Sequence, residues 1–235
     1  MTNSVAKTKK QDVATRPEFM KGKGRGSENV STNDLTIPRL DLIQDLSPQR
    51  KKTDPEYING AEEGMFFNSV SKQLYGDAVI FIPVYFRKEY IIWKSRKSGG
   101  GFAGAFPTES DAFAAIEAQD LNPEIHEVVE SAQHFGIIVD NYTSDTPAVE
   151  EIVMTMSKSK MKANRQLNTM VRMAGGDRFE RAYLIQSYTD RNKQNESYMN
   201  IKVTQKGYVS ENLYHICEKM YESVAGGVKD VVRDK

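Results

Sequence analysis

The stretch DAVIFIPVYFRKEYIIWKS, residues 77–95, decides the fold class. Its first half, residues 77–86, is a continuous apolar run of β-type residues, which indicates a central strand. Pro83 interrupts this run, and a proline inside a strand belongs at an edge or at a bulge because it has no amide hydrogen to donate. The second half, residues 89–95, follows closely with the same pattern. The stretch therefore predicts either one strongly bent strand or a hairpin.

Four further segments carry strand patterns. They are residues 64–76, which read as two short strands about a turn, residues 134–142, residues 150–157, and a hairpin at 179–203. Many short strands favour a small barrel. The sequence therefore predicts a mainly β (α+β) protein with a five-stranded barrel of the oligonucleotide-binding (OB) type. A β-sandwich is the alternative that these patterns leave open.

Three segments are expected to be helical. Residues 158–176 and 209–224 have apolar side chains at helical spacing, and a pair of glycines would end the first of these two helices. Residues 109–133 are acidic and follow Thr108, which is placed as a helix cap. Because this segment lies between two strand patterns, we expect it to form an acidic helical insertion at the edge of the barrel.

The ends of the chain differ in composition from the middle. Residues 1–33 have few large apolar side chains and an excess of Lys and Arg, so they are predicted to be a disordered basic tail. The predicted domain covers residues 34–224. Residues 225–235 are expected to be a flexible C-terminus.

The overall composition excludes several classes of protein. The single cysteine, Cys217, excludes an internal disulfide framework and fits a reducing cytoplasm. Three scattered histidines have no metal-ligand spacing, so neither a metal nor another cofactor is expected. No apolar run is long enough to cross a bilayer, and the polar N-terminus does not resemble a secretory signal. No catalytic or phosphate-loop motif is present, which predicts a protein that is not an enzyme.

Charge is balanced in total but segregated along the chain. The 32 Lys and Arg residues equal the 32 Asp and Glu residues in number. However, residues 109–130 contain seven acidic residues and no Lys or Arg, whereas residues 157–172 contain five basic residues and no acid. A neutral total can therefore still present a basic groove, because screening limits each block to a reach of about 8–10 Å.

Cations alternate with aromatic residues between Tyr85 and Phe106. Single-stranded nucleic acid is held by cations along its phosphates and by aromatic faces that stack on its bases. The candidate phosphate contacts are Arg87, Lys88, Lys94, Arg96 and Lys97, and the candidate stacking residues are Tyr90, Trp93 and Phe102. The alternative is that the aromatic residues belong to the core and that the cations form a solvated rim.

Strand alternation divides these candidates. It places Tyr90 with Ile92 on one face and Trp93 with Ile91 on the other. Tyr90 and Trp93 therefore cannot share a face of a regular strand, and one of the two is expected in the core. The cations and a flexible glycine-rich loop at 98–106 are the preferred contacts.

A second basic segment follows the strand at 150–157. Its cations are Lys158, Lys160, Lys162 and Arg165. The first, third and fourth of these are three or four residues apart and would share a helical face, which either lines phosphates or is an ordinary solvated surface. Tyrosines of the hairpin at 179–203 are a third candidate surface.

The order of these segments resembles a group of tailed-phage proteins that are described as single-stranded DNA-binding proteins with an OB fold. The resemblance covers about residues 35–224 and is most specific at WKSRKSGGGF (93–102) and SKMKANRQLN (159–168). It implies a role in phage replication, recombination or repair in the host cell cytoplasm. Better-known relatives of this kind end in an acidic tail that recruits partners. This chain ends in VKDVVRDK, so residues 109–130 are the available surface for replication or recombination proteins.

The sequence thus predicts non-catalytic, sequence-tolerant binding of single-stranded DNA. The main alternative is a protein-interaction module, such as a phage-encoded inhibitor of a host defence or nuclease. A virion or assembly protein is a third hypothesis. The oligomeric state is left open.

Overall fold

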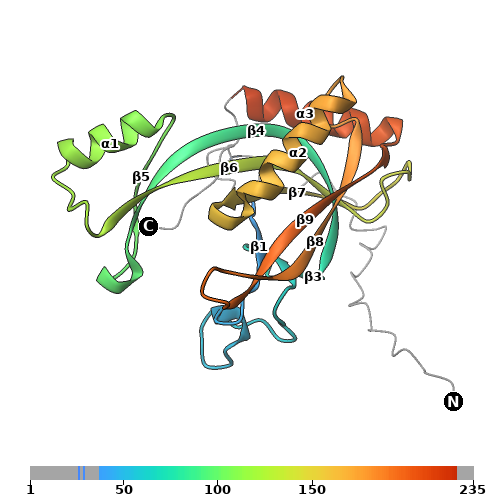
Figure 1. The fold of residues 1–235 in the computed structure, drawn as a ribbon. Helices are drawn as coiled ribbons and strands as arrows, with labels where there is room; N and C mark the ends of the chain where they lie inside the picture. Colours follow the sequence, from blue (N-terminus) through green and yellow to red (C-terminus); the bar gives the residue numbers. More distant parts are fainter. Residues whose placement is uncertain (1–25, 27–28, 30–36, 227–235) are drawn as a thin grey trace, which may run out of the picture.

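The computed structural model describes residues 26, 29 and 37–226, and the predictions for the tail at 1–33 and for residues 227–235 lie outside this part. One strongly curved antiparallel sheet forms the centre of the fold (Figure 1). Its strand order is β7-β6-β4-β8-β9, and β5 also pairs with β4. The strands are β4 (Ala78–Lys94), β5 (Phe102–Phe106), β6 (His126–Val139), β7 (Val149–Ser157), β8 (Arg181–Arg191) and β9 (Ser197–Tyr208).

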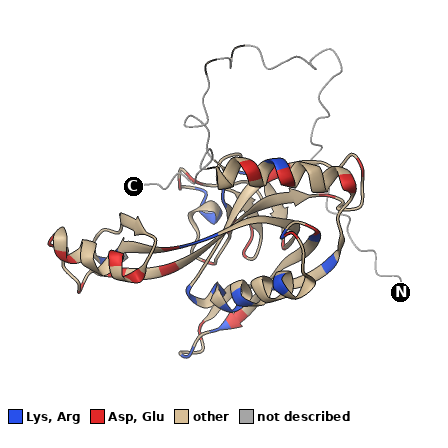
Figure 2. Ribbon diagram, turned by 90° about the horizontal axis from the view of Figure 1, so that it is seen from above, with Lys and Arg blue, Asp and Glu red and all other residues tan. Residues whose placement is uncertain are grey.

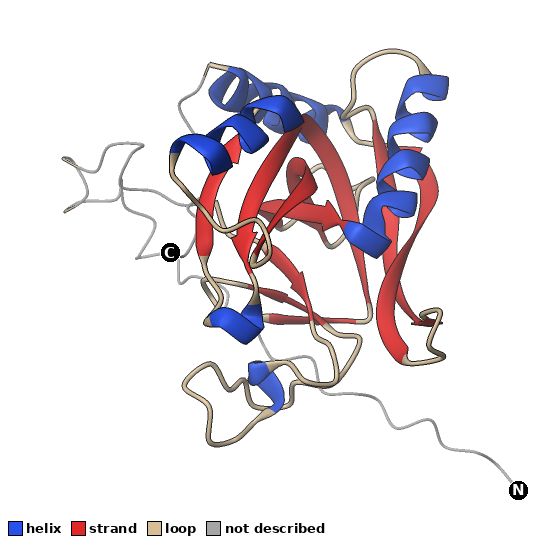
Figure 3. Ribbon diagram, turned by 60° about the vertical axis from the view of Figure 1, so that its left-hand side comes forward, coloured by secondary structure: helices blue, strands red, loops and turns tan. Residues whose placement is uncertain are grey.

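A small sheet and three α-helices complete the described chain. The small sheet has the order β1-β2-β3, with β1 at Leu40–Leu42, β2 at Phe66–Asn68 and β3 at Leu74–Gly76. The helices are α1 (Glu109–Ala118), α2 (Met161–Ala174) and α3 (Glu211–Ala225), and short 3₁₀ turns lie at Pro48–Arg50 (η3), Arg96–Ser98 (η4) and Lys158–Lys160 (η5). The helices lie at the periphery of the strands (Figure 3).

The mainly β, α+β class is confirmed, whereas the closed barrel is not. In the described residues, β7 and β9 are the outer strands of the main sheet, and no backbone ladder joins them. The small sheet reaches toward both: the amide of Val153 in β7 donates to the carbonyl of Pro38 at 2.8 Å, and the side chain of Gln44 donates to the carbonyl of Met199 in β9 at 2.9 Å.

Residues 77–95 form one bent strand, which was one of the two predicted outcomes. The ladder between β4 and β6 shifts between Pro83 and Tyr85, so a bulge lies at the proline, as its missing amide hydrogen predicted. The ladder to β8 ends at Phe81, just before this bulge. Gly136 lies opposite Pro83 and permits the close approach, because a Cβ atom there would lie 2.2 Å from the carbonyl oxygen of Ile82.

The two faces of the sheet are covered by different helices. On one face, α2 packs through Leu167 against a cluster that contains Phe81 and Met156. On the other face, α3 packs through Leu213 against a cluster that contains Phe135. All of these side chains are fully buried. The body of the protein is therefore a sheet held between two amphipathic helices.

The acidic segment at 109–133 is only partly helical, which corrects the predicted helical insertion. α1 ends at Ala118, and β6 already begins at His126 and pairs with the second half of β4. A strand forms here despite the acidic composition because residues 126–133 complete the ladder with β4, and because two of their carboxylates form ion pairs with lysines. Glu127 pairs with Lys158, and Glu130 pairs with Lys88. The loop predicted at 98–106 is likewise shorter, because residues 102–106 form β5.

The second halves of β4 and β6, with β5 and α1, form an extension at residues 87–133 that we call the arm. Figures 1 and 2 show it projecting from the body. The arm has its own apolar cluster, in which Ile92 packs with Ala112 and Ile116 of α1. Because β4 and β6 run without interruption through both parts, the arm is joined to the body by a continuous ladder.

Candidate nucleic-acid interface

Two of the predicted phosphate contacts are held by neighbouring side chains at the base of the arm. Arg87 is 3.1 Å from the carboxylate of Glu89 and also donates to the side chain of Gln133. Lys88 is 3.5 Å from the carboxylate of Glu130, and its ammonium lies 5.5 Å from the ring centre of Tyr90. These charges are largely neutralised within the protein, so they are weak candidates for phosphate contacts.

The predicted separation of Tyr90 and Trp93 is confirmed. Tyr90 is half-buried against the apolar cluster under α1, so it is the one of the two that belongs to a core. Trp93 is 38% exposed on the other face of the strand and contacts Phe102, with ring centres 5.9 Å apart. The pair Trp93–Phe102 therefore keeps an exposed aromatic surface on the arm.

The cations near the tip of the arm are more accessible. Lys97 is exposed and Lys94 is half-exposed, and neither forms an ion pair within the described residues. The side chain of Arg96 lies outside the part that the structure describes. Lys94 and Lys97 lie between Trp93 and Phe102 in sequence, so a small basic and aromatic surface is present here.

The second basic segment does not form the single helical face that its spacing predicted. Lys158 lies in η5 with a backbone φ of +50°, and its ammonium is 2.8 Å from the carboxylate of Glu127. Lys160 is half-buried, and burial lowers the pKa of its ammonium while nearby Asp41 opposes that shift. Only Lys162 and Arg165 lie on α2 itself, and both are exposed.

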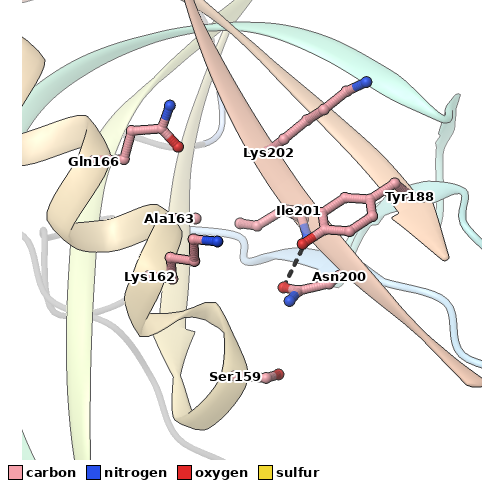
Figure 4. Close-up of a pocket in the computed structure, with 8 residues that line it drawn as sticks. All are labelled: Ser159, Lys162, Ala163, Gln166, Tyr188, Asn200, Ile201 and Lys202. Carbon is pink, nitrogen blue, oxygen red and sulfur yellow. Dashed lines mark hydrogen bonds between the residues drawn. The ribbon is translucent and has the colours of Figure 1, made fainter. Parts of the chain in front are cut away.

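Lys162 borders a groove between the start of α2 and the outer strand β9 (Figure 4). The groove has a volume of about 260 Å³. Its lining is Ser159, Lys162, Ala163 and Gln166 from η5 and α2, and Tyr188, Asn200, Ile201 and Lys202 from β8 and β9. The side chain of Gln166 donates to the carbonyl of Val203 at 3.3 Å and so ties the helix to the edge of β9.

Two tyrosines on the hairpin are held in place by one carboxylate beside this groove. Asp190 accepts hydrogen bonds from the hydroxyls of Tyr188 and Tyr198 at 3.2 and 3.1 Å, and from the side chain of Asn200 at 3.0 Å. These bonds, that of Asn200 foremost, lower the pKa of Asp190. The ring positions are thus fixed before any ligand arrives, which limits the entropy lost on binding.

One ion pair lies between the groove and the exposed aromatic pair on the arm, formed by Lys158 and Glu127. Trp93 lies directly opposite Glu127 in the ladder, so their side chains share a face. Glu127 forms an ion pair with Lys158, and the next residue in the chain, Ser159, lines the groove. Figure 2 shows basic residues on α2 and acidic residues on α1. A polyanion is therefore expected to lie along α2 and to avoid the α1 side of the arm.

A buried polar network fixes α2 on the sheet behind the groove. His134 of β6 is fully buried; its Nδ1 accepts from Arg178 at 2.9 Å, and its Nε2 lies 2.9 Å from the side-chain oxygen of Asn164 in α2. Asn168 accepts from Arg178 and donates to Asn164. Because Arg178 can only donate, His134 is neutral, with its proton on Nε2.

The network predicts a pH-dependent stability. Burial and then the charge of Arg178 lower the pKa of His134 from 6.5 to about 3. Below pH 6.5 the unfolded chain binds a proton that the folded protein excludes. The free energy of unfolding should therefore fall by about 1.4 kcal/mol per pH unit as the pH decreases from about 6 toward 3. Urea unfolding between pH 7 and 5 measures this.

The control for this prediction is a second histidine. His134→Gln should remove this part of the pH dependence, whereas His215→Gln, on the exposed surface of α3, should retain it. Equal slopes in the two variants would contradict the assignment to His134.

Sequence reasoning named residues on both sides of the groove without predicting the groove itself. Lys162 of the second basic segment and Tyr188 and Lys202 of the hairpin line it, whereas Gln166 and Asn200 were not singled out. Strand alternation could have placed Asn200 in the site, because Asn200 and Lys202 share a face of β9 and Tyr188 pairs directly with Asn200. This alternation does not reveal that β9 lies beside α2.

The described residues contain neither a metal-binding cluster nor a membrane-spanning helix. No group of three or more His, Cys, Asp or Glu side chains is arranged to hold a metal ion in that part of the chain. Among its helices, none is both long and apolar enough to span a membrane.

The fold and site define an antiparallel β protein of the α+β class with a basic groove between a helix and an outer strand. The chain belongs to the Pam3 phage gp34-like protein family, whose model matches residues 7–230. This family name supports the phage origin that the sequence resemblance implied. Neither the curated proteins nor the solved structures include a match to the chain.

Proposed function

We propose that this protein binds single-stranded DNA without catalysis and without strong sequence preference, in phage replication, recombination or repair. The observation that carries the proposal is the groove at the start of α2, which is lined by Lys162 and Lys202 together with Tyr188 and Asn200 (Figure 4). Neither lysine forms an ion pair within the described chain, so both charges are available to phosphates.

The chemistry of the groove suits a single strand. Its start is the first turn of α2, which contains no acidic residue and whose preceding side chain makes no capping hydrogen bond. Such a helix end favours anions. Half-buried tyrosine rings next to it can stack on bases, and stacking contributes about 1–3 kcal/mol per base. Neither the phosphate contacts nor the stacking contacts distinguish one base from another, so we infer that binding tolerates different DNA sequences.

The relation to OB folds is part of this proposal. Folds of that type are partly open five-stranded barrels that bind oligonucleotides on the exposed surface of their strands. A curved sheet whose outer strands β7 and β9 are not joined by a ladder does not conflict with that geometry. In the same proposal the acidic segment at 109–130 is kept away from the DNA and is left available to a protein.

Trp93 provides a direct test because it is the only tryptophan in the chain. Titration with oligo-dT at low salt should change its emission, since the path from the groove leads through Lys158 and Glu127 to Trp93. Binding is measured independently by the anisotropy of a labelled oligonucleotide. If anisotropy shows no complex at low salt, the proposal fails. If a complex forms with Trp93 unchanged, the DNA is confined to the groove and the arm takes no part.

A nuclease-treated pull-down from host lysate separates the proposal from the protein-interaction alternative. DNA affinity in the purified protein supports the proposal. A stoichiometric protein partner together with no DNA affinity would replace it with the interaction module.

A further inference from the structure

A second groove lies on the arm, beside α1. It has a volume of about 240 Å³ and is lined by Phe113, Ile116, Glu117, Asp120, Leu121 and Pro123. Ile116 is buried against the arm, but Phe113 is 53% exposed although it is a large apolar residue. The groove therefore combines an exposed aromatic side chain with a polar rim, as interaction sites on proteins commonly do.

Two of the residues that line this groove, Glu117 and Asp120, are acidic and exposed. Three more exposed carboxylates are near them in sequence, so that five belong to this part of the arm, namely Glu109, Asp111, Glu117, Asp120 and Glu124. None of the five forms an ion pair with Lys or Arg within the described residues. The surface therefore fits an extended segment that has several cations and at least one large apolar side chain.

The chain itself contains such a segment. Residues 7–25 hold seven Lys and Arg residues against two acidic ones, and Phe19 and Met20 lie in their middle between Arg16 and Lys21. We propose that residues 7–25 dock on the α1 groove of the same molecule, with Phe19 and Met20 beside Phe113 and with the cations on the carboxylates of this part of the arm. This inference does not depend on DNA binding.

The connecting chain is long enough for this contact within one molecule. The described chain begins beside β7, where Pro38 bonds to Val153, which pairs with Phe135 of β6. From Phe135 to the far end of β6 at His126 is about 30 Å at the rise of a β-strand. The residues between Arg25 and Ile37 can span about 40 Å when extended. A tethered segment also has a local concentration on the order of millimolar, which favours it over an external competitor.

A photo-crosslinker in the full chain tests the proposal. A benzophenone amino acid at Ala114, which is exposed next to Phe113, should form a cross-link to residues 7–25 in the monomer. Mass spectrometry of the digested monomer band identifies the peptide. At 1 M NaCl the yield should fall about fivefold or more, because the screening length shrinks to about 3 Å.

A matched pair of variants tests the role of charge. Glu117→Lys with Asp120→Lys should reduce the cross-link about tenfold, since both side chains line the groove. Glu218→Lys with Glu222→Lys, which makes the same change on exposed positions of α3, should leave the yield unchanged. Thermal unfolding followed by circular dichroism checks that both variants remain folded.

Several results would overturn the proposal. These are a cross-link to other parts of the chain, a cross-link only in a dimer band, and an equal loss in both variant pairs. A cross-link that forms only after a host protein is added would also overturn it, in favour of the external replication or recombination partner expected for residues 109–130.

Discussion

Lys162→Glu combined with Lys202→Glu should lower the affinity for oligo-dT by about tenfold or more at moderate salt. The two ammonium groups border one groove, from α2 and β9, so their reversal replaces two attractive charges with two repulsive ones at the proposed phosphate path. Loss of two phosphate contacts should also reduce the slope of log affinity against log salt by about 1.4, at about 0.7 per contact for a single strand.

The matched control for this variant is Lys219→Glu. Lys219 is exposed on α3, which covers the opposite face of the sheet from α2. Its reversal changes the net charge in the same direction without touching the groove. Anisotropy titrations at three or more salt concentrations give both affinity and slope. An equal loss per reversed charge in the control would show that only net charge matters and would remove the groove from the proposal.

Gly136→Ala should reduce the free energy of unfolding by about 1–3 kcal/mol, the usual cost of overpacking a filled core. A Cβ atom at Gly136 would lie 2.2 Å from the carbonyl oxygen of Ile82 and 2.5 Å from the ring of Phe81. The first of these neighbours is backbone and cannot rotate away. The bulge at Pro83 lies directly opposite, so the clash also acts on the bulge in β4.

Gly207→Ala is the corresponding control for stability. A Cβ atom there would lie 3.2 Å from the edge of the Tyr142 ring, which is a side chain that can shift. Urea unfolding of both variants measures the difference, and each kcal/mol corresponds to about 2–4 °C in Tm for a domain of this size. Similar stabilities for the two variants would contradict the assigned role of Gly136.

The strands near Pro83 show what local sequence can predict. The apolar run, the position of the proline and the strand alternation are local properties. They left a bent strand or a hairpin, and an edge or a bulge at Pro83, as the alternatives, and they predicted the separation of Tyr90 from Trp93. The helices at 161–174 and 211–225 follow from apolar spacing in the same way. These features depend on neighbours along the chain rather than on the partner strand.

The errors occur where distant residues decide the structure. Residues 126–133 form a strand because β4 extends far enough to pair with them, and their acidic side chains are balanced by Lys88 and Lys158. The contacts of Arg87 with Glu89 and Gln133 were not predicted either. The groove likewise needs α2 to lie against β9, which are separated by the whole of β8. Sequence spacing contains none of these long-range pairings.

The position of α2 beside β9 has one more consequence, for solubility. The outer strand of an open sheet presents unpaired backbone groups that can recruit a strand from another molecule and start aggregation. Here the side chain of Gln166 in α2 donates a hydrogen bond to the backbone carbonyl of Val203, so α2 covers part of the edge of β9. The helix that borders the proposed binding groove thus also protects the strand edge from pairing with another molecule. Changes that loosen α2 should therefore be detected first as aggregation, before the rest of the sheet unfolds.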